Sequence, residues 1–170
     1  ILMAKVYLSL GSNIERYKRI GAALDALVKQ FGELIISPVY ESVSVGFDGD
    51  NFLNLVVAMN TDIPVGALSN ALREIENNNG RVRAGSKFSA RTLDIDILTY
   101  GSEVGLIDGI ELPRDEITKY GFVITPLVDI AANELLPGSD KTYQTIATEL
   151  NLDEKELWPV EFRWPDNIAL

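Results

Sequence analysis

The stretch T-L-D-I-D-I-L-T-Y, residues 92–100, alternates apolar and acidic side chains at its centre. Because successive side chains of a β-strand point to opposite faces, this pattern predicts a strand. Leu93, Ile95 and Ile97 would then face the core, beneath helices. Asp94 and Asp96 would stand together on the opposite face, which makes them the first candidates for a functional site.

The segments before this strand complete a recognisable order. Apolar and β-branched runs of strand length alternate with stretches in which apolar residues recur at helical spacing. The predicted elements are strand 5–10, helix 20–31, strand 34–40, strand 52–59, helix 64–76 and strand 92–100. The order β-α-β-β-α-β predicts a ferredoxin-like α+β fold, an antiparallel sheet with two helices on one face.

The rest of the chain is less regular and is expected to add to this unit at its C-terminal side. Residues 101–112 fit a hairpin, residues 122–130 are apolar around Pro126, and residues 142–150 fit a short helix. Residues 158–170 contain both tryptophans and fit no period. We therefore predict a single domain over residues 1–170, with a core at 3–150 and a C-terminal tail at 151–170.

Composition excludes several kinds of site. The 170 residues contain no cysteine and no histidine, which excludes disulfides, thiolate or imidazole metal sites and histidine-based catalysis. A bound metal needs oxygen ligands, which favours Mg²⁺, Ca²⁺ or Mn²⁺. The net charge of −10 disfavours binding to nucleic acid. Apolar runs are too short to span a membrane, so we expect a cytoplasmic protein.

A basic segment leads into the aspartate pair. Arg81, Arg83, Lys87 and Arg91 lie within eleven residues that contain no acid. Arginines bind phosphate oxygens and carboxylates bind hard cations, so the combination fits a metal-bound polyphosphate. The alternative is a solvated strand face whose charges, and those of the basic segment, form ordinary surface pairs.

Two isolated residues fit a flat heterocyclic ligand. Asn54 interrupts a predicted strand, where Asn is disfavoured, and its amide can hydrogen-bond to the edge of a heterocycle. Phe122 can stack on a flat ring. The alternatives are that Asn54 is hydrogen-bonded locally and that Phe122 fills the core.

Residues 11–13, Gly-Ser-Asn, are predicted to form a turn that caps the first helix.

The joint spacing of these motifs resembles the 6-hydroxymethyl-7,8-dihydropterin pyrophosphokinase family. The most specific segment is R-T-L-D-I-D-I-L at residues 91–98, preceded by G-R-V-R at 80–83. The other matching segments are L-G-S-N at 10–13, F-L-N at 52–54, I-E at 75–76, G-F at 121–122 and P-L at 126–127. The similarity covers residues 4–150 and implies the same ferredoxin-like fold that the element order predicts independently.

The resemblance implies a role for each matching residue. Asp94 and Asp96 would bind two magnesium ions and, with Arg81 and Arg91, form the catalytic set. The ATP site would comprise Arg81, Arg91, Glu76, Arg83, Phe88, Ile97 and Arg114. The loop at 81–91 would close over the substrates and exclude water. The pterin pocket would comprise Ser42, Val43, Phe52, Asn54 and Phe122, with Tyr40 or Phe52 as the second aromatic ring.

Several positions depart from the family pattern, and most of them lie near the nucleotide. Arg114 stands where well-studied members carry histidine, and Tyr120 stands where they carry arginine. The other departures are Val43 for a common proline, Arg73 for a neutral polar residue, Phe88 for a common tryptophan and Ser89 for glycine.

The resemblance thus implies a monomeric enzyme of folate biosynthesis that transfers diphosphate from ATP to 6-hydroxymethyl-7,8-dihydropterin and releases AMP. Two alternatives stay open. One is a divergent paralogue that binds the pterin without efficient turnover, which the departures at Arg114 and Tyr120 favour. The other is a non-catalytic ferredoxin-like ligand-binding module, against which the retained Asp94 and Asp96 argue.

Overall fold

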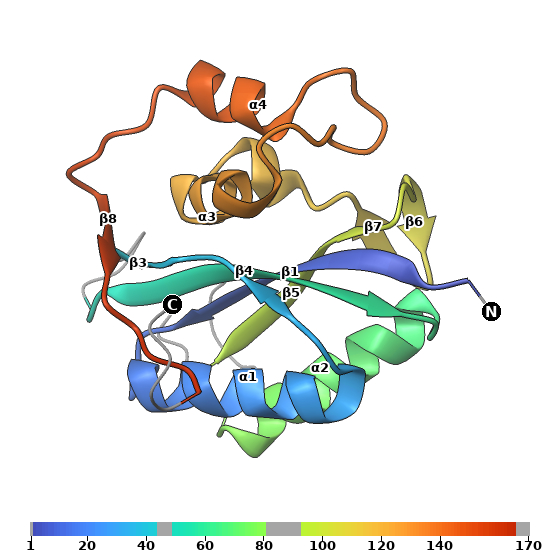
Figure 1. Cartoon of the computed structure of the whole chain (residues 1–170), viewed down its shortest axis with the longest axis horizontal. Helices are drawn as coiled ribbons and strands as arrows, with labels where there is room; N and C mark the ends of the chain where they lie inside the picture. Colours follow the sequence, from blue (N-terminus) through green and yellow to red (C-terminus); the bar gives the residue numbers. More distant parts are fainter. Residues whose placement is uncertain (1, 44–48, 81–92, 166–170) are drawn as a thin grey trace.

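The predicted order of elements is confirmed. The computed structural model describes residues 2–43, 49–80 and 93–165 (Figure 1). Its elements are β1 (Ala4–Ser12), α1 (Arg16–Phe31), β2 (Ile35–Ile36), β3 (Val39–Ser42), β4 (Phe52–Thr61), α2 (Val65–Asn78), β5 (Asp94–Tyr100), β6 (Gly105–Ile107), β7 (Ile110–Leu112), a 3₁₀ helix η1 (Asp115–Thr118), α3 (Gly121–Ala131), α4 (Tyr143–Leu150) and β8 (Leu157–Val160).

One antiparallel sheet organises these elements. Its strand order is β5-β1-β4-β3-β8, and β2 pairs with β4 beside β3. Helices α1 and α2 cover one face, as the ferredoxin-like pattern requires (Figure 1). The core on that face includes Leu93, Ile95 and Ile97 of β5, as the alternation in residues 92–100 predicts.

Helices α3 and α4 cover part of the opposite face and form a second core there (Figure 1). This core joins Tyr7, Val56 and Leu98 of the sheet to Leu127 of α3 and Tyr143 of α4. Because helices cover β4 on both faces, residues 53–59 are all buried. A strand with no face toward solvent does not alternate between apolar and polar residues.

Two local expectations were wrong. Gly11 and Ser12 continue β1 instead of forming a turn, and the N-cap of α1 is Glu15, which makes no side-chain cap hydrogen bond. The predicted strand 34–40 is divided into β2 and β3 at Ser37 and Pro38. Proline has no N–H to donate, and the Ser37 hydroxyl accepts the hydrogen bond from Val56 N–H at 2.9 Å instead.

The C-terminal segment returns to the sheet. Strand β8 pairs with β3, opposite the side on which β3 pairs with β4. Beyond it, Phe162 is buried and its ring stacks on Tyr17 of α1 at 5.9 Å. The Trp164 indole N–H donates to the Asp25 carboxylate of α1 at 2.7 Å. The segment therefore bridges the edge of the sheet and helix α1.

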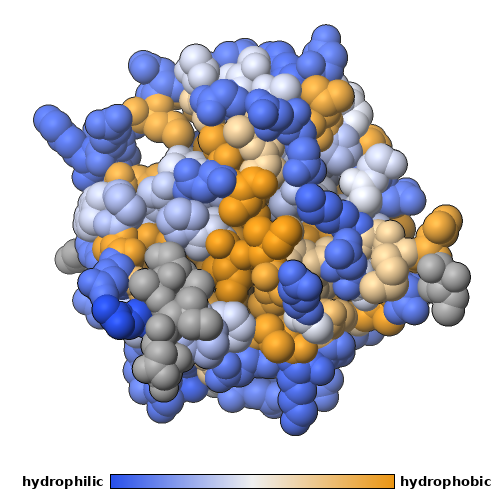
Figure 2. All heavy atoms as spheres, in the orientation of Figure 1, coloured by the Kyte–Doolittle hydropathy of each residue, from blue (hydrophilic) through white to orange (hydrophobic). Residues whose placement is uncertain are grey.

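Surface polarity follows the layers. Figure 2 shows mainly hydrophilic residues over the helical layers at the top and bottom of the view, and apolar residues gathered at mid-height, at the level of the sheet. Among the described residues, no helix combines the length and the apolarity needed to cross a membrane.

Candidate active site

The site is organised by a row of residues that crosses four strands on one face of the sheet. Gly11 of β1 pairs with Asp94 of β5 on one side and with Asn54 of β4 on the other. Asn54 in turn pairs with Tyr40 of β3. Because neighbouring strands lie about 4.8 Å apart, Asp94 and Asn54 are separated by about 10 Å. The glycine between them leaves the strand surface open.

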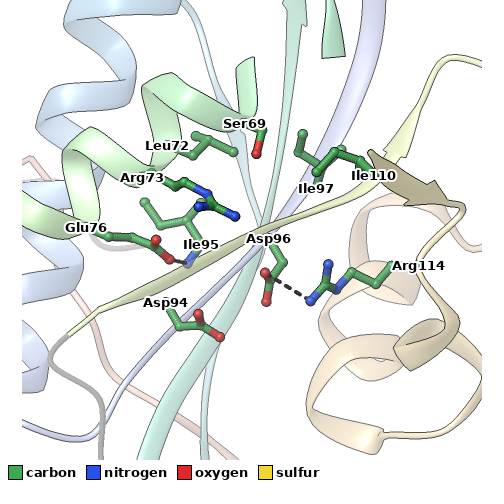
Figure 3. A pocket seen from close by; sticks show the side chains of 10 residues that line it. All are labelled: Ser69, Leu72, Arg73, Glu76, Asp94, Ile95, Asp96, Ile97, Ile110 and Arg114. Carbon is green, nitrogen blue, oxygen red and sulfur yellow. Dashed lines mark hydrogen bonds and ion pairs between the residues drawn. The ribbon is translucent and has the colours of Figure 1, made fainter. Parts of the chain in front are cut away.

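The two aspartates share this face but are not the freely solvated pair that a bare strand would present. The Asp96 side chain is only 24% exposed, and Arg114 Nη2 lies 3.3 Å from Asp96 Oδ1 (Figure 3). Desolvation, followed by the charge of Asp94, raises the pKa of Asp96, and the Arg114 guanidinium partly offsets this. A carboxylate in such surroundings favours a bound cation or a proton.

Glu76 supports β5 at the edge of the sheet. Its buried carboxylate accepts a hydrogen bond from Ile95 N–H at 2.8 Å. An edge strand leaves such N–H groups without a partner strand, so this bond stabilises the backbone between the two aspartates. Glu76, predicted as an ATP-site residue, thus lines the site and also fixes the strand that carries the aspartates.

A hollow of about 200 Å³ lies between α2 and β5. Arg73 and Glu76 project into it from α2, Asp94 and Asp96 border it on β5, and Arg114 reaches it from beyond β7 (Figure 3). Among the described residues, no group of three or more acidic side chains is arranged to hold a metal. The aspartate pair alone suits a cation that keeps ligand positions for water and phosphate oxygens.

The other end of the row forms a buried polar pair. Asn54 Nδ2 donates to Ser42 Oγ at 2.7 Å. An added Cβ on Gly11 would lie 3.1 Å from Asn54 Oδ1, so this acceptor faces the open strand surface. Phe52 is half-buried on the same face, and Val43 is more exposed.

Phe122 lies in the first turn of α3 and packs against the core of this face. Its ring stacks on Tyr120 with centroids 5.1 Å apart. The described structure therefore places the predicted residues Ser42, Phe52, Asn54, Asp94 and Asp96 on one face of the sheet. Ile97 of β5, also predicted for the ATP site, faces the core on the opposite side, toward α1 and α2. Arg81, Arg83, Phe88 and Arg91 lie outside the described residues.

Comparison with known proteins decides the family. The family described as 7,8-dihydro-6-hydroxymethylpterin-pyrophosphokinase (HPPK) matches residues 7–132. This chain belongs to the HPPK family.

Relatives that are more than 30% identical to this chain indicate the same family. The 2-amino-4-hydroxy-6-hydroxymethyldihydropteridine pyrophosphokinase of Haemophilus influenzae is 34% identical over 152 residues, covering 87% of this chain and 91% of the relative. The protein of the same name from Pseudomonas aeruginosa is 36% identical over 140 residues, covering 80% and 86%. Membership of the HPPK family makes this chain a pyrophosphokinase, a diphosphotransferase.

Solved structures share the fold. The HPPK-DHPS of Plasmodium falciparum, solved with pterin and p-hydroxybenzoate, has a TM-score of 0.74 at 14% identity. The match covers 94% of this chain and 47% of that chain, so this chain corresponds to about half of the larger protein. The likeness supports the ferredoxin-like α+β fold.

Part of the lining of the hollow was not predicted from the sequence. Ser69, Leu72 and Ile110 border it and were not predicted. Residues 69, 72, 73 and 76 follow the i, i+3, i+4, i+7 spacing of one helix face. Three of the four, Ser69, Arg73 and Glu76, are polar, and polar residues at that spacing beside the apolar face of the helix were the available signal.

Proposed function

We propose that this chain transfers the β,γ-diphosphate of ATP to the hydroxymethyl group of 6-hydroxymethyl-7,8-dihydropterin in folate biosynthesis and releases AMP. The row Asp94, Gly11, Asn54 is the observation that carries this proposal. It sets a carboxylate pair suited to a metal-bound polyphosphate and an amide suited to a heterocycle about 10 Å apart, across two strand spacings.

The pterin would lie at the Asn54 end. Asn54 Oδ1 would accept hydrogen bonds from the amino and ring N–H donors of the pterin, and the Ser42 hydroxyl, which already accepts from Asn54, retains a hydrogen to donate. Phe122 would stack on the ring. Phe52 is the better second ring, because Cδ1 of Phe52 lies 3.9 Å from the position of an added Gly11 Cβ, while the Tyr40 hydroxyl is engaged by Asp129.

The nucleotide would occupy the hollow between α2 and β5, where Arg73, Glu76, Ile97 and Arg114 line the walls. Arg81 and Arg91 would contact the phosphates, with Arg83 and Phe88 near the nucleotide, as the sequence resemblance implies. Arginine suits these contacts because its planar fork of donors matches phosphate oxygens.

Asp94 and Asp96 would hold two Mg²⁺ ions. The donor set fits, because hard cations prefer carboxylate oxygens and the two side chains share one face of β5. When bound, Mg²⁺ supplies charge neutralisation to the transferring phosphoryl oxygens.

The hydroxymethyl oxygen would attack the β-phosphorus in line with the bond between that phosphorus and the α,β-bridging oxygen. The new O–P bond forms as the old one breaks, and AMP leaves with the bridging oxygen. Asp96 would draw the hydroxyl proton, directly or through the metal that it would hold. Positioning and electrostatics would supply most of the rate enhancement.

The row lies within one chain, so we also propose that a monomer is active, and that it works in the cytoplasm. The test measures AMP release from Mg²⁺ and ATP, with and without the pterin, and pterin binding by calorimetry. AMP release that depends on the pterin supports the proposal. Pterin binding without AMP release would instead identify a divergent paralogue, and neither binding nor release would identify a ligand-binding module of another kind.

A further inference from the structure

Arg114 is held between two carboxylates at the mouth of the hollow. Its backbone N–H donates to Leu98 O of β5 at 2.8 Å, which fixes the residue beside the strand of the aspartates. Its side chain spans from Glu116 to Asp96, with Nε 3.1 Å from Glu116 Oε1 and Nη2 3.3 Å from Asp96 Oδ1. Figure 3 shows the guanidinium aimed at Asp96 across the open side of β5.

The guanidinium and a divalent cation compete for the same oxygens. Asp96 and Asp94 lie side by side on one face, and an ion held by both would bring its charge close to that of Arg114. Two cations in a partly desolvated site repel each other strongly, because the effective dielectric constant there is well below that of water. A divalent cation that binds alone must therefore displace or oppose Arg114.

The contact with Glu116 gives the side chain a way to change partners. Glu116 engages Nε, whereas Asp96 is reached by Nη2 at the end of the fork. The guanidinium has five donors, so its outer N–H groups can turn to a phosphate while Nε stays on Glu116. The Glu116 side chain is only 12% exposed, which favours a lasting ion pair at this anchor.

We propose that Arg114 is an internal counter-ion that exchanges partners during substrate binding. In the free protein it neutralises Asp96. When a divalent cation takes Asp96, Arg114 turns to the nucleotide phosphates. The inference rests on the proposed function, because it assumes a metal at the aspartates and a nucleotide in the hollow. Its consequence is that metal alone binds weakly and that metal and nucleotide favour each other's binding.

The experiment uses Mn²⁺ as the metal probe, followed by electron paramagnetic resonance, and α,β-methylene-ATP as a nucleotide that cannot transfer its diphosphate. Two affinities are measured on the full chain: that of Mn²⁺ without nucleotide, and that of the analogue at saturating Mn²⁺. Arg114→Gln is expected to bind Mn²⁺ alone about 5- to 10-fold more tightly than wild type and to bind the analogue about 10-fold more weakly, magnitudes typical of coupled sites.

Opposite changes in the two affinities distinguish this role from a structural one, since damage to the site would weaken both. Lys119→Gln is the matched control, because it also removes one positive charge, five residues after Arg114, from an exposed pair with Asp115. It should change neither affinity. Equal or weaker Mn²⁺ binding by Arg114→Gln would overturn the exchange.

Asp96→Asn separates this inference from the proposed function. It should abolish Mn²⁺ binding at the aspartates. Mn²⁺ binding that survives Asp96→Asn would show that the metal lies elsewhere, and would overturn both the metal assignment and the exchange. Loss of Mn²⁺ binding in Asp96→Asn, together with unchanged binding in Arg114→Gln, would leave the metal assignment standing and refute the exchange alone.

Discussion

Gly11 lies in a central strand, where glycine is usually unfavourable because it packs nothing and gains chain entropy on unfolding. Its neighbours across the sheet are Asp94 and Asn54, the two ends of the candidate site. An added Cβ would lie 3.1 Å from Asn54 Oδ1, close enough to force the amide to move. The proposed function accounts for this glycine, because the pterin would lie over it.

Gly11→Ala should separate binding from stability. We expect pterin affinity to fall about 10-fold, on the order of 1.4 kcal/mol, because the methyl group shifts Asn54 and fills the open surface. Stability should hold or rise by up to ~1 kcal/mol, since alanine loses less chain entropy. Calorimetry with the pterin and thermal melts measure the two effects.

Gly21→Ala is the matched control, because nothing lies within 4 Å of an added Cβ at this position of α1. It should stabilise the helix by roughly 0.5–1 kcal/mol and leave pterin binding unchanged. Wild-type pterin affinity in Gly11→Ala would refute the placement of the ligand over β1.

Asp96→Asn should cost at least ~10²-fold in turnover, because a metal site supplies several kcal/mol and each ~1.4 kcal/mol is a factor of ten. The variant should still fold. Asp62→Asn, an exposed site with the same charge change, should retain wild-type turnover. Near-normal turnover in Asp96→Asn would remove the aspartate from the mechanism.

Asp96 also makes the stability of the metal-free protein depend on pH. Desolvation and the charge of Asp94 raise the folded-state pKa of Asp96 above its unfolded value. The folded chain therefore holds this proton more tightly, so stability falls as pH rises from about 4 through the raised pKa. Thermal melts of Asp96→Asn should not show this fall in stability with rising pH. A fall of the same size in the variant would show that Asp96 is not its cause.

At the scale of elements, β8 supports the strand that carries Ser42. Ser42 pairs with Leu157 of β8, and Val43 N–H donates to Glu156 O at 3.3 Å. Phe162 anchors the segment beneath α1 by its stack on Tyr17. The C-terminal segment is thus tied to the strand at the Asn54 end of the candidate site.

Phe162→Ala should destabilise the protein by about 3 kcal/mol, the low end for a buried phenylalanine, because the segment lies near the chain end and can relax. Pterin affinity should also fall, since β3 loses part of its support. Phe162→Leu should show a smaller loss of both. Denaturant melts and pterin titrations measure them, and unchanged pterin affinity in a destabilised Phe162→Ala would show that β8 does not position β3.

Local sequence patterns predict the helices and strands well, but they predict poorly which residues of different elements come into contact. The alternation of residues 93–97 sets their faces because each side chain depends only on its place in the strand. The Arg114 ion pair with Asp96 could not be predicted, because the β6–β7 hairpin lies between the two residues and its path decides whether they meet. Likewise, no local signal shows that Glu76 would satisfy an edge N–H of β5.

At the scale of the molecule, two cores share one sheet, and strand β4 contributes to both. Neither core can lose its packing without exposing a face of β4, which favours cooperative unfolding. That residues 1–170 act as one domain, with a tail after residue 150, stays a prediction.

Both tryptophans lie in the C-terminal segment, at 158 and 164, so fluorescence reports on that segment and circular dichroism on the helices. We expect the two thermal transitions to coincide. A fluorescence transition at clearly lower temperature would show that the C-terminal segment detaches before the rest of the chain unfolds.

³¹P NMR of the reaction products shows whether this chain transfers diphosphate to the pterin. Incubation with ATP, Mg²⁺ and 6-hydroxymethyl-7,8-dihydropterin should yield AMP and a pterin diphosphate ester in equal amounts, because the bond broken lies between the α- and β-phosphates. ADP with a pterin monophosphate, or AMP with free pyrophosphate and unmodified pterin, would show that the chain does not transfer diphosphate to the pterin.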